Sequence, residues 1–254
     1  MKKIILSLLL SLSSVVCSLE PVILLFGPPG SGKGTFSQLA KEQGYNHLSA
    51  GDVIRDEITN KTPFGLKVEE IVKRGEYVDP VIFCQMMKEK ITSLCAEGNP
   101  LIVDGFGRTS EDMQVLVDTI SSLQLADSTL VLFFDAEDAI CKERISGRLV
   151  CNDCHHVYNT KHTPFHAGDS CLNCGVGVLQ ERINDTLQVI NKRMADYRNS
   201  IEKSYKISLD FFPAIFFNSG QESAVCLNFY KELLTQIKDH EGDTKTFVTK
   251  FDQK

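Results

Sequence analysis

The chain has 254 residues, of which 43% are hydrophobic and 24% are charged, and its formal net charge is -6. These values are typical of an ordinary soluble globular protein and argue against intrinsic disorder. The acidic balance also argues against nucleic acid as a partner, because proteins that wrap nucleic acid usually have a basic surplus. A chain of this length favours one large domain with insertions over two independent domains.

The first 18 residues have the pattern of a secretory signal peptide. Lys2 and Lys3 precede an apolar run over residues 4–12, and small residues follow before Cys17 and Ser18. The run is too short to form a permanent membrane helix, so we expect no stable membrane span. The alternative is a hydrophobic extension or a start codon assigned too early. We expect the protein to stay in the cytoplasm, with export through this segment as the alternative.

A strand, a glycine-rich loop and a helix follow one another in the next part of the chain. Residues 22–26 form a continuous apolar run, residues 27–35 read GPPGSGKGT, and a helical pattern continues through Ala40. Glycines at this spacing allow backbone amides to approach phosphate oxygens, while Lys33 bridges the outer phosphates. The loop departs from the strict pattern, because Gly34 follows Lys33 and the hydroxyl comes at Thr35. We interpret this segment as a phosphate-binding loop (P-loop).

Further buried strands are predicted along the rest of the chain. Apolar runs recur at residues 101–104, 130–135 and 214–217, with amphipathic helical stretches between them. Alternating strands and helices predict an α/β fold, a three-layer core with a parallel sheet covered on both faces. Residues 49–78 and 150–180 do not fit the alternation, and we interpret them as insertions that close over a ligand. The polar residues after His240 are expected to fray.

An acidic side chain and an arginine follow the predicted strand at residues 101–104. Asp104 ends the strand, and Arg108 lies just beyond it. Ligands bind at this edge of open α/β sheets, and magnesium needs hard oxygen partners. We therefore expect Asp104 to stand beside the P-loop, near Mg²⁺ and its water shell.

The cysteines fall into two groups. Four of the nine form two pairs, Cys151 with Cys154 and Cys171 with Cys174, and 16 residues separate the pairs. This spacing favours a closed, structural four-thiolate zinc (Zn²⁺) site, and two disulfides are the alternative. Four other cysteines lie in apolar segments, where reduced cysteine is a small core residue. They are Cys84, Cys95, Cys141 and Cys226.

Four motifs together resemble adenylate kinase and its nucleoside monophosphate kinase relatives, from about residue 21 to residue 234. They are the loop at residues 27–35, Ser49-Ala-Gly-Asp52-x-x-Arg55, Asp104-Gly-Phe-x-Arg108 and Arg144-x-x-x-Arg148. The resemblance implies a P-loop core with an acceptor-binding helical flap and a small zinc-bearing lid. It implies three parts of the chain: a signal-like segment at 1–18, a kinase domain at 19–240 and a polar tail at 241–254. Within the kinase domain, the flap covers residues 49–78 and the lid covers residues 144–181.

The same resemblance assigns roles to individual residues. The implied catalytic cations are Lys33, Arg108, Arg148, Arg182 and Arg193. The implied ATP-binding residues are Gly30, Ser31, Gly32, Lys33, Gly34, Thr35, Arg144, Arg148, Tyr158 and Gly220, with Arg144 as a platform for adenine. The implied acceptor-binding residues are Ala50, Arg55, Val78, Gly105, Arg108, Asp112, Arg182 and Arg193. Asp52 and Asp104 are placed near the magnesium shell, and Asp185 is expected to pair with a lid arginine when the lid closes.

Three departures from the adenylate kinase pattern affect the acceptor site. Ala50 stands where Thr is usual, Gly107 replaces a Pro and Asp112 replaces a base-contacting Gln. An ionised Asp112 offers only hydrogen-bond acceptors, which suits a base with an amino group. We expect AMP to be the preferred acceptor, with CMP or GMP detectable and UMP poorest.

The resemblance implies a monomeric enzyme that converts ATP and AMP reversibly into two ADP, with Mg²⁺ on ATP and structural zinc in the lid. The alternative within the family is a CMP, UMP or GMP kinase. A non-catalytic nucleotide-binding zinc protein is the alternative of another class, and it requires idle lid arginines. ADP formation with a panel of monophosphates distinguishes the three.

Overall fold

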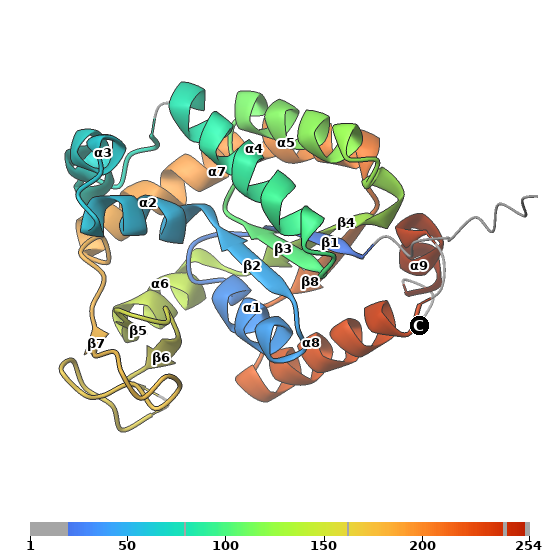
Figure 1. Cartoon of the computed structure of the whole chain (residues 1–254). Helices are drawn as coiled ribbons and strands as arrows, with labels where there is room; N and C mark the ends of the chain where they lie inside the picture. The colour runs from blue at the N-terminus through green and yellow to red at the C-terminus, as the bar shows by residue number, and fades with distance from the viewer. Residues whose placement is uncertain (1–19, 79, 162, 241–242, 252–254) are drawn as a thin grey trace, which may run out of the picture.

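The computed structural model describes residues 20–78, 80–161, 163–240 and 243–251. The signal-like segment lies outside these residues. The chain forms an α/β fold with a central parallel sheet between two layers of helices (Figure 1). The predicted three-layer fold class is therefore confirmed.

The central sheet has five strands in the order β2-β3-β1-β4-β8. Their bounds are Val22–Phe26 for β1, Asn46–Ser49 for β2, Leu101–Asp104 for β3, Thr129–Asp135 for β4 and Ala214–Asn218 for β8. All four neighbouring pairs run parallel. The carboxyl ends of the strands consequently meet at one edge of the sheet, which is where ligands bind in folds of this type.

Helices cover both faces of this sheet. α4 (Pro80–Ala96), α5 (Ser110–Ser122) and α7 (Leu187–Phe211) cover one face, and α1 (Lys33–Glu42), α8 (Ser223–Lys238) and α9 (Thr244–Phe251) cover the other (Figure 1). Alternate residues of β1 point to opposite faces: Val22 and Leu24 belong to the first apolar cluster, and Ile23 and Leu25 to the second. The continuous apolar run at residues 22–26 thus reflects a strand that is buried on both sides.

Two smaller parts project beyond the carboxyl edge of the sheet. Within the flap, α2 (Ala50–Thr59) packs against α3 (Pro63–Lys73). Within the lid, β5 (Arg148–Cys151), β6 (Val157–Asn159) and β7 (Leu179–Gln180) form an antiparallel sheet in the order β6-β5-β7. α6 (Asp138–Ser146) leads into the lid, and a short 3-10 helix, η1 (Ala126–Ser128), precedes β4. The flap and the lid lie on the same side of the core (Figure 1).

Two elements differ from the sequence-based expectation. The edge strand β2 was not predicted, because its sequence, Asn-His-Leu-Ser, has no apolar run. The expectation of a frayed tail was wrong for residues 244–251, which form α9. The Thr244 hydroxyl donates to the Thr129 carbonyl oxygen at 2.7 Å, and the Phe247 side chain is buried in the second apolar cluster.

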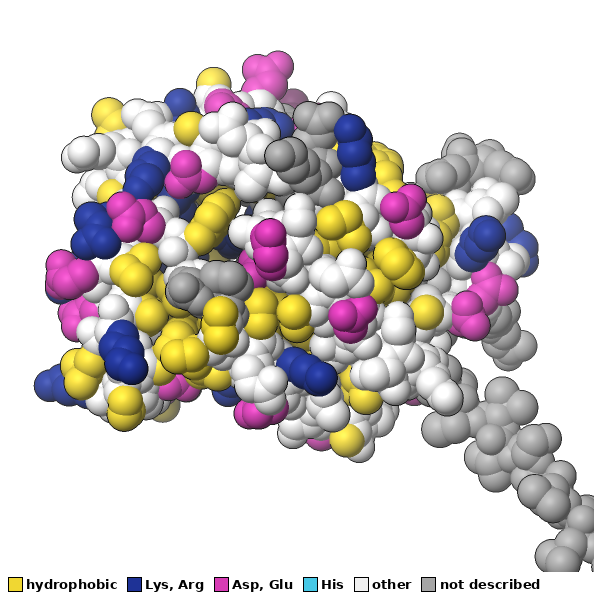
Figure 2. Space-filling view, turned by 90° about the horizontal axis from the view of Figure 1, so that it is seen from above, with side chains coloured by type: hydrophobic (Ala, Val, Ile, Leu, Met, Phe, Trp, Pro, Cys, Tyr) yellow, Lys and Arg dark blue, Asp and Glu magenta, His cyan; other side chains and the backbone are white. Residues whose placement is uncertain are grey.

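The surface of the molecule and the lengths of its helices each bear on the kinds of partner that the protein can have. On the face drawn in Figure 2, basic and acidic side chains are interspersed with apolar ones. That mixture differs from the continuous basic surface that nucleic-acid-binding proteins present. Among the residues that the structure describes, every helix is too short or too polar to span a bilayer.

Candidate active site

The P-loop connects β1 to α1 and closes around the Lys33 side chain. Gly30 has a φ of 83°, a left-handed conformation that glycine adopts without strain. The Lys33 ammonium donates to the carbonyl oxygens of Gly27 at 2.7 Å and of Pro28 at 3.0 Å. Burial lowers the pKa of Lys33 to about 8, an effect that Asp104 opposes and Arg108 reinforces. The first amides of α1 have no helical partners, so the loop can accept an anion.

Asp104 stands at the carboxyl end of β3, beside the P-loop. The parallel register pairs Asp104 with Leu25, so its carboxylate lies next to the end of β1. Its buried Oδ1 atom has no hydrogen-bond partner among the described residues. An unpartnered carboxylate oxygen facing a phosphate-binding loop fits the hard oxygen ligand that Mg²⁺ requires.

Six arginines line one cleft of about 480 Å³. Arg144 lies at one end of it, and the other five come from separate segments. Each comes from a different part of the fold: Arg55 from α2, Arg108 from the segment after β3, Arg148 from β5, Arg182 from the segment after β7 and Arg193 from α7. Guanidinium groups gathered in this way repel one another unless an anion lies between them. The cleft is therefore suited to bind several phosphate oxygens at once.

Asp185 holds two of these arginines in place. It accepts two hydrogen bonds from Arg148, at 2.6 and 2.8 Å, and its Oδ1 lies 3.5 Å from a nitrogen of Arg193. The predicted pairing of Asp185 with a lid arginine is confirmed. Burial lowers the pKa of Arg193 to about 10 and that of Arg182 well below its usual value, and Arg148 contributes to both shifts. Asp185 thus pairs with Arg148 and Arg193, and the Arg182 guanidinium remains buried beside another arginine.

Asp52 lies in a different environment from Asp104. Its carboxylate forms an ion pair with Arg55, and a second nitrogen, from Arg182, lies 4.0 Å away. Although burial opposes ionisation, Arg55 and Arg182 hold the pKa of Asp52 at about 2. The geometry therefore gives Asp52 arginines as its immediate partners, whereas Asp104 has the free oxygen suited to magnesium.

The flap side of the cleft has apolar walls and one carboxyl group. Ala50, Val78 and Phe83 line it, and so does Asp112. The Cys84 thiol donates to Oδ1 of Asp112 at 3.4 Å. Burial raises the pKa of Asp112, although hydrogen bonds from Cys84 and the Thr109 segment and the charge of Arg108 oppose this rise. Burial beside the apolar walls thus favours the neutral form of this carboxyl.

The opposite end of the cleft contains Arg144 and Tyr158. The Arg144 guanidinium donates to the carbonyl oxygens of Ser219 at 2.9 Å and of Gln221 at 3.2 Å, which fixes it against the loop after β8. Tyr158 lines the cleft from β6. Gly220 belongs to the loop that holds Arg144 and does not itself line the cleft.

Gly107, which stands where adenylate kinases usually have a proline, adopts a left-handed backbone conformation. Its φ is 81°, whereas proline requires a φ near −65°. A side chain at this position would also meet Met113, whose Cε lies 3.0 Å from the ideal Cβ. The Gly107 carbonyl oxygen accepts a hydrogen bond from Ser204. The backbone at Gly107 therefore has a conformation that glycine can adopt and proline cannot.

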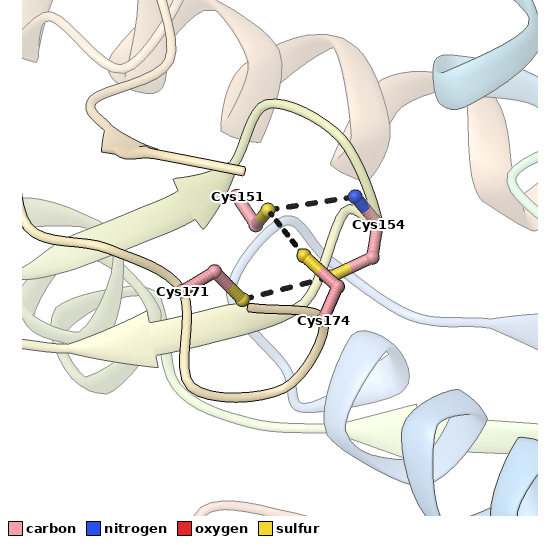
Figure 3. Close-up of side chains that lie close together, drawn as sticks. All are labelled: Cys151, Cys154, Cys171 and Cys174. Atoms are coloured by element: carbon pink, nitrogen blue, oxygen red, sulfur yellow. Dashed lines mark hydrogen bonds between the residues drawn. The ribbon is translucent and has the colours of Figure 1, made fainter. Parts of the chain in front are cut away.

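The four lid cysteines converge at the end of the small sheet (Figure 3). Their sulfur atoms all lie within 4.8 Å of one another, and the pairs Cys151 with Cys174 and Cys154 with Cys171 are 3.7 Å apart. Zinc–sulfur bonds of about 2.3 Å in a tetrahedron place sulfur atoms about 3.8 Å apart, whereas a disulfide needs about 2.05 Å. The arrangement fits a metal ion better than two disulfides.

Hydrogen bonds around the cysteines support the same interpretation. The backbone amide of Cys154 donates to Cys151 Sγ at 3.4 Å, and that of Gly177 donates to Cys174 Sγ at 3.3 Å. Burial raises the pKa of Cys171, but hydrogen bonds, chiefly with the Tyr158 hydroxyl, lower it to about 6 overall. Burial raises the pKa of the Cys151 thiol to about 12, so the pKa shifts of the cysteines do not all favour the thiolate form. The amide donors do, because they stabilise the thiolates that zinc binds.

Nearly all the predicted substrate-binding residues line this one cleft. They are Gly30, Ser31, Gly32, Lys33, Gly34, Thr35, Ala50, Asp52, Arg55, Val78, Asp104, Gly105, Arg108, Asp112, Arg144, Arg148, Tyr158, Arg182 and Arg193. Cys84 and His155 also contact carboxylates of the cleft, Asp112 and Asp52 respectively, and these contacts were not predicted. Neither lies in a motif, so only the three-dimensional structure identifies them.

Comparisons with known proteins agree with this geometry. A family model described as adenylate kinase matches residues 25–211. The adenylate kinase of Carboxydothermus hydrogenoformans is 35% identical over 178 residues, which cover 69% of this chain and 81% of that protein. The adenylate kinase of Mycoplasma mobile is 32% identical over 208 residues, or 81% of this chain and 89% of that protein. The adenylate kinase of Chlamydia pneumoniae is 35% identical over 181 residues, or 70% and 80%.

Proposed function

The chain belongs to the adenylate kinase family, and from this membership we propose that it transfers the terminal phosphate of ATP reversibly to AMP, forming two ADP. The observation that supports this most is the gathering of Lys33 and six arginines around one cleft. Phosphoryl transfer needs little covalent help from a protein. It needs several fixed cations aimed at oxygens that gain negative charge in the transition state.

On the donor side, we assign the P-loop and Lys33 to the outer phosphates of ATP. Lys33 already lies within the loop, where carbonyl oxygens hold its ammonium group. Arg144, fixed by the loop after β8, forms a flat support for adenine, because guanidinium planes stack on aromatic rings. Arg148 extends from β5 toward the same phosphates, and Asp185 orients it.

On the acceptor side, we assign Arg55 and Arg108 to the phosphate of the monophosphate. Both line the cleft next to the apolar walls of the flap, where a base can be buried. Arg182 and Arg193 lie between the two sides, in position to neutralise the group in transit. Their burial makes them effective, because charge interactions strengthen where water is excluded.

Two metal ions belong to the proposal. Asp104, with its free carboxylate oxygen, is assigned to the shell of the Mg²⁺ that accompanies ATP and neutralises phosphate charge. We assign zinc to Cys151, Cys154, Cys171 and Cys174 as a structural ion. Four thiolates leave no open position for a substrate, so this zinc has no chemical step to perform.

The experiment is a measurement of diphosphate formation from ATP with AMP, CMP, GMP and UMP in turn. We expect AMP to give the highest kcat/KM. A pyrimidine monophosphate or GMP ranking first would assign the protein to a different acceptor within the family. Tight nucleotide binding without diphosphate formation from any acceptor would contradict the enzymatic function.

We also propose that the protein is located in the cytoplasm, which is the typical location of this family. We further propose that it is a monomer. Sequencing the amino terminus of protein from its native cell tests the location, and a mature start near Leu19 would indicate export instead. Sedimentation analysis tests the oligomeric state.

A further inference from the structure

A histidine of the lid touches two carboxylates of the flap. His155 lies between β5 and β6, directly after Cys154. Its Nε2 atom is 3.2 Å from Oδ1 of Asp56, and its Nδ1 atom is 3.8 Å from Oδ1 of Asp52. The two aspartates are four residues apart on α2, so they lie on the same face of that helix. The imidazole ring therefore bridges adjacent turns of the flap.

The cysteine turn holds His155 in this place at a conformational cost. His155 has a φ of 60°, a left-handed conformation that is uncommon for residues other than glycine, although asparagine, aspartate and histidine adopt it more often than the rest. The turn is fixed on both sides, because the Cys154 amide donates to Cys151 Sγ at 3.4 Å and the Cys151 amide donates to the His156 carbonyl oxygen at 3.0 Å. Strained residues persist where the surrounding structure determines them, and many contribute to function.

The bridge reaches residues that we assign to substrate binding. Asp52 also forms an ion pair with Arg55 and lies 4.0 Å from a nitrogen of Arg182. One end of the bridge is thus in the lid, which we assign to ATP, and the other is next to the arginine that we assign to the acceptor phosphate. The contact exists only while the lid and the flap are close together.

We propose that His155 is a positioning residue that couples the lid to the flap, so that ATP and AMP each strengthen the binding of the other. The inference rests on the proposed function, because it needs two substrates bound to two parts. When ATP closes the lid, or AMP closes the flap, the two ends of the bridge come closer together. The other nucleotide then binds to a protein in which the bridge forms more readily. Linkage requires the effect to be reciprocal, with the same factor in both directions.

The expected size of the effect follows from exposure. The side chain of His155 is 27% exposed and that of Asp56 is 55% exposed. Pairs at such positions contribute about 1.4- to 5-fold to an equilibrium constant. We expect the loss of the bridge to reduce the mutual strengthening of ATP and AMP by a factor in this range.

The experiment measures by calorimetry the Kd of a non-hydrolysable ATP analogue with and without AMP, and the Kd of AMP with and without the analogue. The variants are His155→Asn, Asp56→Ala and the double variant. Asparagine tolerates the left-handed backbone, so His155→Asn shortens the side chain without changing the turn. The matched control is His166→Ala, a lid histidine whose side chain is 84% exposed.

We expect each single variant to lower the coupling factor equally for both ligands, the double variant to lower it no further, and His166→Ala to leave it unchanged. Unchanged coupling in both single variants, or no coupling in the wild type, would overturn the inference. A fall in coupling only together with a fall in metal content would also overturn it, because His155 would then act through the cysteine site. If His155→Asn does not fold, Asp56→Ala alone decides. Failure of the proposed function has a different signature, absence of diphosphate formation in the wild type.

Discussion

The core and the lid are stabilised in different ways. In the core, β1 is buried along its whole length, and large aromatic side chains such as Phe36, Phe134 and Tyr230 pack together between the sheet and its helices. Among the lid residues that the structure describes, the buried cluster is Leu149, Leu179 and two of the cysteines, with Tyr158, Phe165 and the other two cysteines partly buried against it. A segment with so little apolar surface needs a metal ion or disulfides to stay folded.

This difference matters for function because the site takes residues from both regions. Lys33 begins the core helix α1 and Asp104 ends the core strand β3, whereas Arg148 and Tyr158 belong to strands of the lid sheet. The core groups should keep their positions when the metal is removed, and the lid groups should lose theirs.

Metal removal should have the largest effect, and it should be confined to the lid. Structural zinc contributes about 10–16 kcal/mol in zinc-finger peptides, so chelation should unfold the lid while the core stays folded. Elemental analysis should find about one zinc per chain, and hydrogen exchange should show lost protection only over residues 148–180.

The matched control is Cys226→Ser, which changes a core cysteine outside the cluster and should leave the metal content unchanged. Absence of metal, together with two disulfides by mass spectrometry, would contradict the zinc assignment.

A cavity in the core should destabilise the core whether or not the lid is folded. The Phe134 side chain is fully buried against the rings of Phe36 and Phe217. Phe134→Ala should lower the free energy of unfolding by about 3–5 kcal/mol, whether or not zinc is bound. Leu149→Ala, in the lid, should leave the main denaturation transition in place. Equal shifts of that transition in the two variants would show that the core and the lid unfold as one unit.

The substitution Lys33→Met tests whether the P-loop lysine contributes to catalysis. Removal of one fixed electrostatic donor costs about 100- to 1000-fold in turnover, so we expect a loss of at least about 100-fold in kcat with the fold intact. Lys33→Arg is the control that keeps the charge but changes its geometry. Circular dichroism checks the fold, and near-normal turnover in a folded Lys33→Met protein would remove the catalytic role of the loop.

The sequence predicted those parts of the fold whose physical signal is local. Four of the five core strands are apolar runs, and the glycine loop and the paired cysteines have fixed spacing. β2 was missed because it is a polar edge strand. α9 was missed because its signals, the cap at Asp243 and the spacing of Phe247 and Phe251, are weak in a polar tail.

The sequence indicated which residues belong to the site, but it did not indicate which of them contact one another. The arginines lie in recognisable motifs, but the different surroundings of Asp52 and Asp104 depend on which side chains the fold brings near them. The contact between Cys84 and Asp112 joins α4 to α5, and that between His155 and Asp56 joins the lid to the flap. Such long-range pairs have no signature in a single sequence.

Gly107→Pro should destabilise the core by more than about 1 kcal/mol. Proline cannot adopt the φ of 81° that this residue has, so the substitution forces the loop after β3 to move. Gly107→Ala is the control, with a smaller cost because alanine can reach the left-handed region with strain. Thermal denaturation measures both, and an equal or higher melting temperature for the proline variant would contradict the loop geometry.

The smallest predicted effect concerns Asp112 and pH. Because burial raises its pKa in the folded protein, the stability linked to its neutral form is complete below the usual value of 3.8 and is lost as pH rises through the folded pKa. Asp112→Asn stays neutral, so it should gain stability relative to the wild type as pH rises through that window. Melting temperatures from acid to neutral pH test this. A difference that does not change with pH, or that reverses, would contradict a buried, neutral-favouring carboxyl.

Transfer of phosphate between two nucleotides in this cleft can be followed directly by labelling the phosphate itself. ATP labelled in its terminal phosphate is incubated with AMP, Mg²⁺ and the full-length, metal-loaded protein, and the labelled products are separated. We predict that the label appears in the terminal phosphate of newly formed ADP, and that Lys33→Met abolishes most of this transfer. Label that stays in ATP, or that appears only as inorganic phosphate, would contradict the account.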